Sequence, residues 1–399
     1  MDATIEDLPM TLTEIPAIPP LAYSMITTDA ELAAACVRWQ QSPALALDTE
    51  FMRVSTFYPE VGLIQLADAS AIFLIDPLGI RDWAPFKALM VDANIVKILH
   101  SCSEDMLVFL TFLQALPVPV FDTQIAAALL NEGNSLSYQN LVKQRFGVDL
   151  PKAETRSDWL QRPLTKEQLD YAALDVAYLY QCWQSQRQAL QQLGREPWMT
   201  EECLRLLNNY RSEFSGDFND YYLNFKSGWQ LRPRSLLALQ KLCVWREQRA
   251  RKRNRPRSWI LKDGALFTIA NSMISNKAQL AVVEEVSENF VRHEGDAVLA
   301  LIQEVAAANE ADCPPRQPTP LTNPQKQQLK RMQELVESRA QTLAIPPELL
   351  GRRRVLLPLL YATLLLLPGE KLADSAIPEE LQGWRRKEIL EPLLDLLCP

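Results

Sequence analysis

Acidic side chains and one tyrosine stand in this chain at spacings that suit metal-assisted hydrolysis. Asp48 and Glu50 follow the apolar residues 44–47, so a strand there would carry both carboxylates on one face. Carboxylates this close repel each other unless a cation lies between them. Carboxylate oxygens are the ligands that Mg²⁺ and Mn²⁺ prefer, so the pair is a candidate metal site.

Three further residues extend this pattern downstream. Asp105 follows the β-rich stretch 94–99, and Ser101 and Glu104 have capping-box spacing, which predicts Asp105 in a first helical turn. Tyr171 and Asp175 are four residues apart, so they share one face of a helix. That helix is predicted to begin at Thr165 as N-cap, with Gln168 at the capping-box position after Pro163.

Each piece also has a purely structural interpretation. A lone Asp-x-Glu is more often a solvated strand end, Asp105 could simply complement a helix dipole, and Tyr171 could be an edge of the core. The chain supplies a comparison, because Asp29-Ala30-Glu31 has the same spacing but follows Thr28, with which Glu31 forms a predicted capping box. Only the ordered set Asp-x-Glu, Asp, Tyr-x-x-x-Asp favours an active site.

The ordered set resembles the tyrosine-bearing branch of the DEDD exonuclease superfamily, and its flanks are similar to the ribonuclease D family. The flanks are Leu47-Asp48-Thr49-Glu50-Phe51, His100 to Asp105, Phe121-Asp122-Thr123-Gln124, Ser157-Asp158-Trp159, Arg162-Pro163-Leu164 and Tyr171 to Val176. This resemblance covers about residues 22–212. Residues 231–270, with Trp245-Arg246-Glu247, resemble a first helicase-and-RNase-D C-terminal (HRDC) module. Residues 349–355 and Gly383-Trp384-Arg385-Arg386 resemble a second, more divergent one.

The resemblance implies a fold and a division into domains. We expect an α/β RNase H-like exonuclease domain, with a mixed sheet flanked by helices, followed by two small all-α HRDC domains. The expected parts are a flexible lead-in at 1–20, the exonuclease domain at 21–212, a first HRDC domain with its connecting segment at 213–311, a Pro-rich linker at 312–324 and a second HRDC-like domain at 325–399. Strands are predicted at 44–51, 61–67, 71–75 and 94–99, and helices at about 103–114, 123–131, 137–146 and 166–182.

The resemblance also implies a reaction, the 3′-5′ exonucleolytic release of nucleoside 5′-monophosphates from RNA. Asp48 would bridge two divalent ions, Mg²⁺ or Mn²⁺, with Glu50 and Asp175 completing one site and Asp105 holding the second. Tyr171 would orient the attacking water. The implied substrate is RNA with a free 3′-hydroxyl, such as a tRNA precursor, with no obligate protein partner. His100 mimics the histidine of the other DEDD branch, but we expect it to close a strand and orient its neighbours.

Charge is distributed unevenly along the chain. The net charge is −8, yet residues 226–262 hold 12 Lys or Arg and one acid, Glu247, a local charge of +11. Such a stretch is typical of phosphate contact, although a solvated helix face is the alternative. The candidate substrate-binding residues are Lys152, Trp159, Arg162, Arg246, Arg249, Arg253, Arg255 and Arg257. For Trp159, a structural role is at least as well supported as contact with the substrate.

Composition narrows the remaining possibilities. Seven dispersed cysteines and only two histidines make a zinc site improbable and suit a reducing cytoplasm. The apolar run 355–367 contains Pro358, is too short to cross a membrane, and is predicted to be a buried helix. No phosphate-binding loop of an ATP motor is present. The alternatives left open are a DNA 3′-5′ exonuclease of the proofreading type and a non-catalytic HRDC binding protein.

Overall fold

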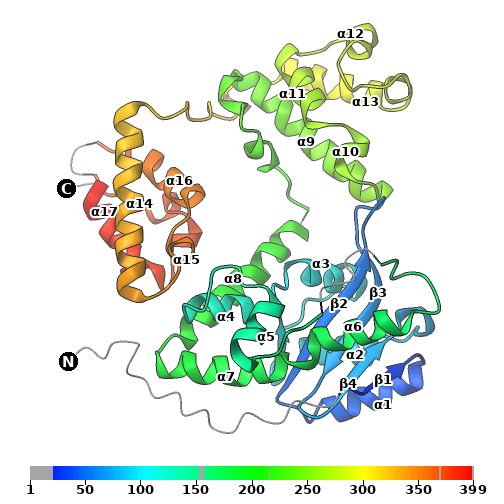
Figure 1. Ribbon diagram of the computed structural model, residues 1–399. Coiled ribbons are helices and arrows are strands. Elements are labelled where there is room, and N and C mark those ends of the chain that lie inside the picture. The colour runs from blue at the N-terminus through cyan, green and yellow to red at the C-terminus, as the bar shows by residue number, and fades with distance from the viewer. Residues whose placement is uncertain (1–20, 152–156, 215, 368–369, 398–399) are drawn as a thin grey trace. The chain divides into compact units, whose positions relative to one another are not determined.

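The computed structural model describes residues 21–151, 157–214, 216–367 and 370–397 (Figure 1). Its contacts divide the chain into two compact units. The first contains Met1–Met52, Val61–Leu206 and Ala340–Leu350, and the second contains Arg53–Glu60, Leu207–Arg339 and Gly351–Pro399. The predicted lead-in 1–20 lies outside the described residues, and the domain boundaries given above stay predictions.

The first unit is built on the expected mixed sheet. Its strand order is β1-β4-β3-β2-β5-β6, with bounds β1 Tyr23–Ile26, β2 Ala44–Met52, β3 Glu60–Ala67, β4 Ile72–Ile75, β5 Val96–Leu99 and β6 Val120–Asp122. β3 and β4 form the predicted antiparallel hairpin, whereas β1 with β4, β2 with β5, and β5 with β6 are parallel. The Asp68 carboxylate closes the hairpin by accepting the Ser70 and Ala71 amides at 2.8 and 2.9 Å.

Helices cover this sheet (Figure 1). They are α1 Asp29–Trp39, α2 Ala84–Val91, α3 Ser103–Phe112, α4 Thr123–Leu129, α5 Tyr138–Phe146, α6 Lys166–Ala177 and α7 Leu179–Gln192. α8 Glu196–Phe214 begins in the first unit and ends in the second. The capping box of Thr28 and Glu31 opens α1, as predicted. α6 packs on β2 and β4, and α3 also packs on β2. The strand that carries Asp48 and Glu50 therefore lies beneath two of the helices that carry the other candidate residues.

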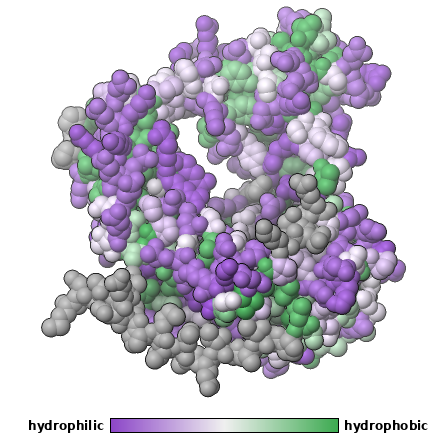
Figure 2. Space-filling view, in the orientation of Figure 1, coloured by the Kyte–Doolittle hydropathy of each residue, from purple (hydrophilic) through white to green (hydrophobic). Residues whose placement is uncertain are grey.

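The second unit is helical, and beyond Leu207 the described residues form no strand. The helices of its first module are α9 Pro233–Arg253, α10 Arg257–Ile260, α11 Asp263–Ser272, α12 Lys277–Ala281 and α13 Glu288–Ala307. Further along the chain, α14 Asn323–Leu343 begins in the second unit and ends in the first, and α15 Pro347–Leu350 belongs to the first. α16 Arg353–Thr363 and α17 Glu391–Leu397 belong to the second unit. α14 buries Leu329, Met332, Val336 and Ala340 on one side, while its visible side is hydrophilic (Figure 2).

The predicted buried helix over 355–367 is wrong at its C-terminal end. α16 ends at Thr363, and Leu365 and Leu367 are largely exposed. Within α16 the buried residues are Val355, Leu356, Leu359 and Leu360, so burial ends before the last part of the apolar run. Among the described helices, none has both the length and the apolar character that a membrane span requires.

Candidate active site

The paired carboxylates stand where β2 leaves the core. Residues 44–47 are completely buried, which fixes the strand, and Asp48 and Glu50 follow on one face. Oxygen atoms of Asp48, Glu50 and Asp175 lie within 4.8 Å of one another. The structure therefore brings together the two ends of the predicted motif, which are more than 120 residues apart in the sequence.

Asp175 reaches this cluster because α6 begins where the sequence predicts. The Thr165 side chain accepts the Gln168 amide, and the Gln168 side chain accepts the Thr165 amide at 2.9 Å. Tyr171 stands one turn before Asp175 and hydrogen-bonds to its carboxylate. The phenol is thus part of the acidic cluster.

The predicted single helix 166–182 is wrong, because it is interrupted at Tyr178, between α6 and α7. The cause is Tyr138 of α5, whose hydroxyl donates to the Leu174 carbonyl at 3.2 Å and accepts the Tyr178 amide at 3.1 Å. The hydroxyl stands between the two groups that a continuous helix would bond directly, and such insertions bend or break helices. Tyr138 thereby fixes the backbone beside Asp175, a role that the sequence analysis missed.

Asp105 lies in the first turn of α3, as predicted, and is buried. The Thr49 hydroxyl, between the two β2 acids, donates to its carboxylate at 2.5 Å. The predicted capping box of Ser101 and Glu104 is wrong, because Cys102 is the N-cap and makes no side-chain cap. The Asp122 carboxylate instead accepts the Ser101 and Cys102 amides, at 3.1 and 2.9 Å, and so anchors this turn from β6.

His100 has the structural role that the sequence favoured. Its Nδ1 bonds Thr123 Oγ1 at 2.8 Å and its Nε2 bonds the Leu136 carbonyl at 3.0 Å. Burial lowers the pKa of the imidazole. Both ring nitrogens are engaged, so the ring joins the end of β5 to the segments that follow.

Burial raises the pKa of each carboxyl group in the cluster. Burial, with repulsion from Asp175 and Asp105, raises the pKa of Glu50 to about 8. Burial raises the pKa of Asp175 to about 7 although Tyr171 hydrogen-bonds to it, and that of Asp105 to about 6 despite Thr49. Burial and the neighbouring carboxylates hold the pKa of Asp48 well above its ordinary value. Oxygen donors that repel one another when ionised suit divalent cations.

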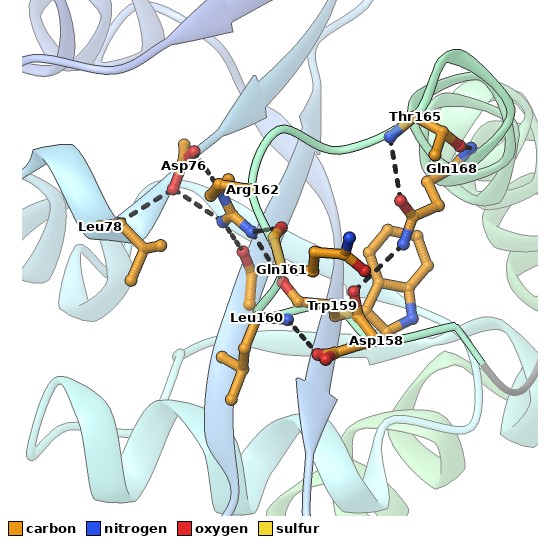
Figure 3. Close-up of polar contacts among 10 residues, drawn as sticks. Asp76, Leu78, Asp158, Trp159, Leu160, Gln161, Arg162, Thr165 and Gln168 are labelled. Carbon is orange, nitrogen blue, oxygen red and sulfur yellow. Dashed lines mark hydrogen bonds and ion pairs between the residues drawn. The ribbon is translucent and has the colours of Figure 1, made fainter.

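Arg162 was a candidate for RNA contact, but its guanidinium is occupied inside the protein (Figure 3). It binds both carboxylate oxygens of Asp76 at 2.7 and 2.8 Å, and it donates to the carbonyls of Gly62, Trp159 and Gln161 at 2.7–2.8 Å. Burial alone would raise the pKa of Asp76, but the hydrogen bonds and charge of Arg162, together with the Leu78 amide, keep that pKa below its ordinary value. Arg162 therefore anchors the segment before α6 to the sheet.

The anchored segment carries Trp159 against the catalytic helix. Trp159 is buried, and its ring centroid lies 6.3 Å from that of Tyr171. A side chain at Gly62 would come within 2.6 Å of the Trp159 carbonyl, so glycine is required for this approach. Gln168 adds a bond from its side-chain amide to the Asp158 carbonyl at 3.3 Å (Figure 3). These contacts give Trp159 a structural role, which the sequence analysis had set against contact with the substrate.

The basic run on α9 and α10 is extensively ion-paired. Buried Glu294 binds Arg249 and Arg253, buried Glu247 binds Arg251 and Arg257, and Asp263 binds Arg246 at 2.6 Å. Glu294 was missed by the sequence analysis because it lies outside the basic stretch, on α13. Arg255 instead donates to the Ser55 carbonyl at 3.1 Å. Lys152 lies outside the described residues.

Comparison with known proteins places these observations in a family. A family model described as 3′-5′ exonuclease matches residues 23–191, and an HRDC domain model matches 235–302. Ribonuclease D of Pseudomonas paraeruginosa is 44% identical over 372 residues, covering 93% of this chain and 96% of that protein. Ribonuclease D of Escherichia coli is 38% identical, with 94% and 98% covered.

Solved structures agree with the sequence relatives. The crystal structure of Escherichia coli RNase D, described as an exoribonuclease involved in structured RNA processing, superposes with a TM-score of 0.84 at 36% identity, covering 94% of this chain and 98% of that one. The catalytic core of RRP6 from Trypanosoma brucei, at 20% identity and a TM-score of 0.53, shares the fold. By sequence identity over nearly its whole length, the chain belongs to the ribonuclease D family.

Proposed function

We propose that this chain removes nucleotides from the 3′ end of RNA by hydrolysis and acts in the 3′-end maturation of tRNA. As a member of the ribonuclease D family the protein is a 3′-5′ exoribonuclease. The observation that carries the proposed mechanism is the cluster of Asp48, Glu50 and Asp175, with Asp105 beside it. A 3′-terminal phosphodiester held at these groups would yield nucleoside 5′-monophosphates one at a time.

The donors of the cluster fit divalent cations. Asp48, Glu50 and Asp175 would hold one ion, Mg²⁺ or Mn²⁺, and Asp105 would help Asp48 to hold a second. When bound, such ions neutralise the phosphate, generate hydroxide from water at neutral pH and stabilise the leaving oxygen. The chain's own acids could not bind an RNA phosphate without them, because four carboxylates would repel it.

Tyr171 supplies orientation rather than proton removal. Burial, reinforced by the Asp175 charge, raises the pKa of its phenol far above the ordinary value of 10.0, so the phenol stays protonated at neutral pH. Its proton is directed to Asp175, which leaves the phenol oxygen free to accept a hydrogen bond from the attacking water. Trp159, packed beside the phenol and held through Arg162, would limit the motion of this ring.

The HRDC module is proposed to bind the body of the RNA. Arg246, Arg249, Arg253, Arg255 and Arg257 remain the candidates there, and the buried acids that pair with several of them would set the directions of their guanidinium groups. Arginines contact phosphates without reading the base sequence. We also propose a cytoplasmic location, since the dispersed cysteines suit a reducing compartment.

The experiment that tests this function is a timed digest of tRNA precursors ending in a 3′-hydroxyl or a 3′-phosphate, with and without EDTA. We expect ladders that shorten by one nucleotide from the 3′-hydroxyl substrate, and only in the presence of divalent cations. Asp48→Asn, run beside the wild type, controls for a contaminating nuclease. Internal cleavage, or digestion that EDTA leaves unchanged, would contradict the proposal. If a DNA strand is digested as fast as the RNA, the alternative function of a DNA 3′-5′ exonuclease is favoured instead.

A further inference from the structure

A hollow of about 590 Å³ lies within the helical unit, between the segment Arg53–Glu60 and the turn that joins α9 to α10. Its lining includes four cationic side chains and one acid, Asp263. The cations are Arg53, Arg246, Arg257 and Lys262. A concave surface with this excess of positive charge favours an anionic ligand.

The two walls of the hollow are fixed to each other. Asn254, in the left-handed conformation at φ 49°, ends α9, and its side-chain oxygen accepts the amides of Phe57 and Tyr58, each at 2.9 Å. Phe57 is buried, and the guanidinium groups of Arg251 and Arg257 each lie 4.9 Å from its ring centroid. A ligand would therefore meet a preformed surface, which limits the entropy lost on binding.

The cations of the hollow differ in how firmly they are held. Arg246 binds Asp263 at 2.6 Å and the Leu261 carbonyl at 2.9 Å, and Arg257 binds Glu247, which is only 1% exposed. Lys262 is paired with Glu285 at 2.7 Å, but the two side chains are 56% and 35% exposed. Ion pairs at such exposure contribute little to stability, so the Lys262 ammonium can leave Glu285 and bind a ligand instead.

An aromatic side chain adjoins the cationic hollow. A second hollow of about 230 Å³ shares Ser258 and Lys262 with the first, and its lining includes Trp259. Trp259 is 61% exposed, with the Arg255 guanidinium 5.7 Å from its ring centroid. An exposed indole beside cations and a hydroxyl is the combination by which proteins hold single-stranded nucleic acid, with phosphates on the cations and a base stacked on the ring.

We propose that the two hollows together bind one internal nucleotide of the RNA substrate, its phosphodiester near Lys262, Arg246 and Ser258 and its base on Trp259. This inference rests on the proposed function and adds a contact site to it. No base edge is read, so the site would accept any sequence.

The test is the affinity of the full-length protein for a single-stranded RNA of about 20 nucleotides, measured by fluorescence anisotropy in EDTA over a range of salt concentrations. Lys262→Glu should weaken binding about fivefold or more and reduce the salt dependence by roughly one phosphate contact. Glu285→Gln should tighten binding, because it releases Lys262. Lys241→Glu is the matched control, since Lys241 pairs with Glu304 at 3.0 Å on the same module with exposures of 43% and 60%, and it should change affinity less than about twofold.

Equal weakening by Lys262→Glu and Lys241→Glu would overturn the proposal, because only overall charge would then matter. If Lys262→Glu weakens the binding of AMP but leaves the binding of RNA unchanged, the proposal is overturned in favour of a site for free nucleotide. Cleavage of a trinucleotide, in the presence of Mg²⁺, serves as the separate readout of the active site. If every variant cleaves the trinucleotide normally, any loss of RNA affinity belongs to the hollow and leaves the proposed reaction untouched.

Discussion

Arg162 provides the sharpest test of how this fold positions its catalytic helix. Replacing it with alanine removes five hydrogen bonds at once, two to Asp76 and three to the carbonyls of Gly62, Trp159 and Gln161. The segment before α6 would lose its attachment to the sheet. Trp159 would then be free to move relative to Tyr171. We expect lower stability and a lower kcat, with little change in KM.

The size of the stability effect follows from partial burial. Breaking a fully buried ion pair costs about 3–5 kcal/mol, and an exposed one contributes about 0–1 kcal/mol. The side chains of Arg162 and Asp76 are 23% and 16% exposed, so we expect about 2–3 kcal/mol. For a folding unit of about 150–250 residues, the size range of the first unit, that corresponds to a fall in Tm of roughly 4–12 °C. A displacement of about 1 Å near the reacting groups can lower kcat by up to about 100-fold.

The dependence on pH has a definite sign. Arg162 holds the folded-state pKa of Asp76 below the ordinary value of 3.8, so this contribution to stability is fully present above that value. It is lost as the pH falls through the lower, folded pKa. The stability difference between wild type and Arg162→Ala should therefore be largest at neutral pH and shrink below about pH 4, as measured by urea unfolding.

Arg145→Ala is the matched control for the activity measurement. Arg145 pairs with Glu132 in the same unit, with exposures of 15% and 19%, and it also donates to Ser185 at 2.7 Å. Its loss should lower Tm by a similar amount but leave kcat unchanged at a temperature where both variants are folded. Arg162→Lys keeps the charge but not the fork of donors, so its kcat should lie between those of Arg162→Ala and wild type. If both alanine variants reduce kcat equally, the positioning role of Arg162 is refuted.

Three further predictions concern the acidic cluster itself. Asp48→Asn should lower kcat by about a thousandfold or more with an unchanged circular dichroism spectrum, and substantial turnover would exclude Asp48 as a metal ligand. Tyr171→Phe should lower kcat about 100-fold and change KM by less than about twofold. A defect confined to KM would contradict the proposal that Tyr171 orients the attacking water. In EDTA the raised pKa values of Glu50 (about 8) and Asp175 (about 7) mean that the folded protein retains protons that the unfolded chain has lost, so stability should fall as the pH rises from about 4 to 8. Mg²⁺ should restore Tm most at pH 8, and a Tm that is independent of pH and Mg²⁺ would argue against this account.

Local signals made much of the active site predictable. Asp48 and Glu50 directly follow a run of apolar residues, which predicts a buried strand from the local sequence. The capping box of Thr165 and Gln168 is likewise complete within four residues. Once β2 and α6 are placed, the period of each element decides which side chains share a face. The β3–β4 hairpin was predictable for the same reason, since its turn closes on the side chain of Asp68.

Errors arose where a distant side chain decides the local structure. The helix 166–182 breaks because Tyr138, 40 residues before Tyr178, inserts its hydroxyl. The turn before α3 is capped by Asp122 rather than by Ser101, because the parallel pairing of β5 and β6 brings that carboxylate beside it. Local capping spacing is a weak guide when tertiary contacts can supply the same hydrogen bond.

Charge counts misled for a related reason. Residues 226–262 contain a single acid, which suggests a broad surface of free arginines, yet Glu247 alone binds two of them. Glu294, from α13, binds two more. Fewer cations of this stretch line a concave surface than the number of Lys and Arg in the sequence suggests. In the structure, the cations of the basic stretch that line a concave surface gather at two adjoining hollows that share Lys262.

The contacts around α6 explain how an active site of mutually repelling acids can keep its geometry. At the N-terminal end, Thr165 and Gln168 cap the helix and Arg162 fastens the preceding segment to Asp76 and Gly62. At the C-terminal end, the Tyr138 hydroxyl donates to the Leu174 carbonyl and accepts the Tyr178 amide. Tyr171 and Asp175 lie between these two attachments, neither of which touches the reacting groups. Because both ends are fixed by neutral or fully paired groups, the approach of Asp175 to the β2 acids is set by the fold and not by the charge of the site, which is the condition for binding cations without first rearranging.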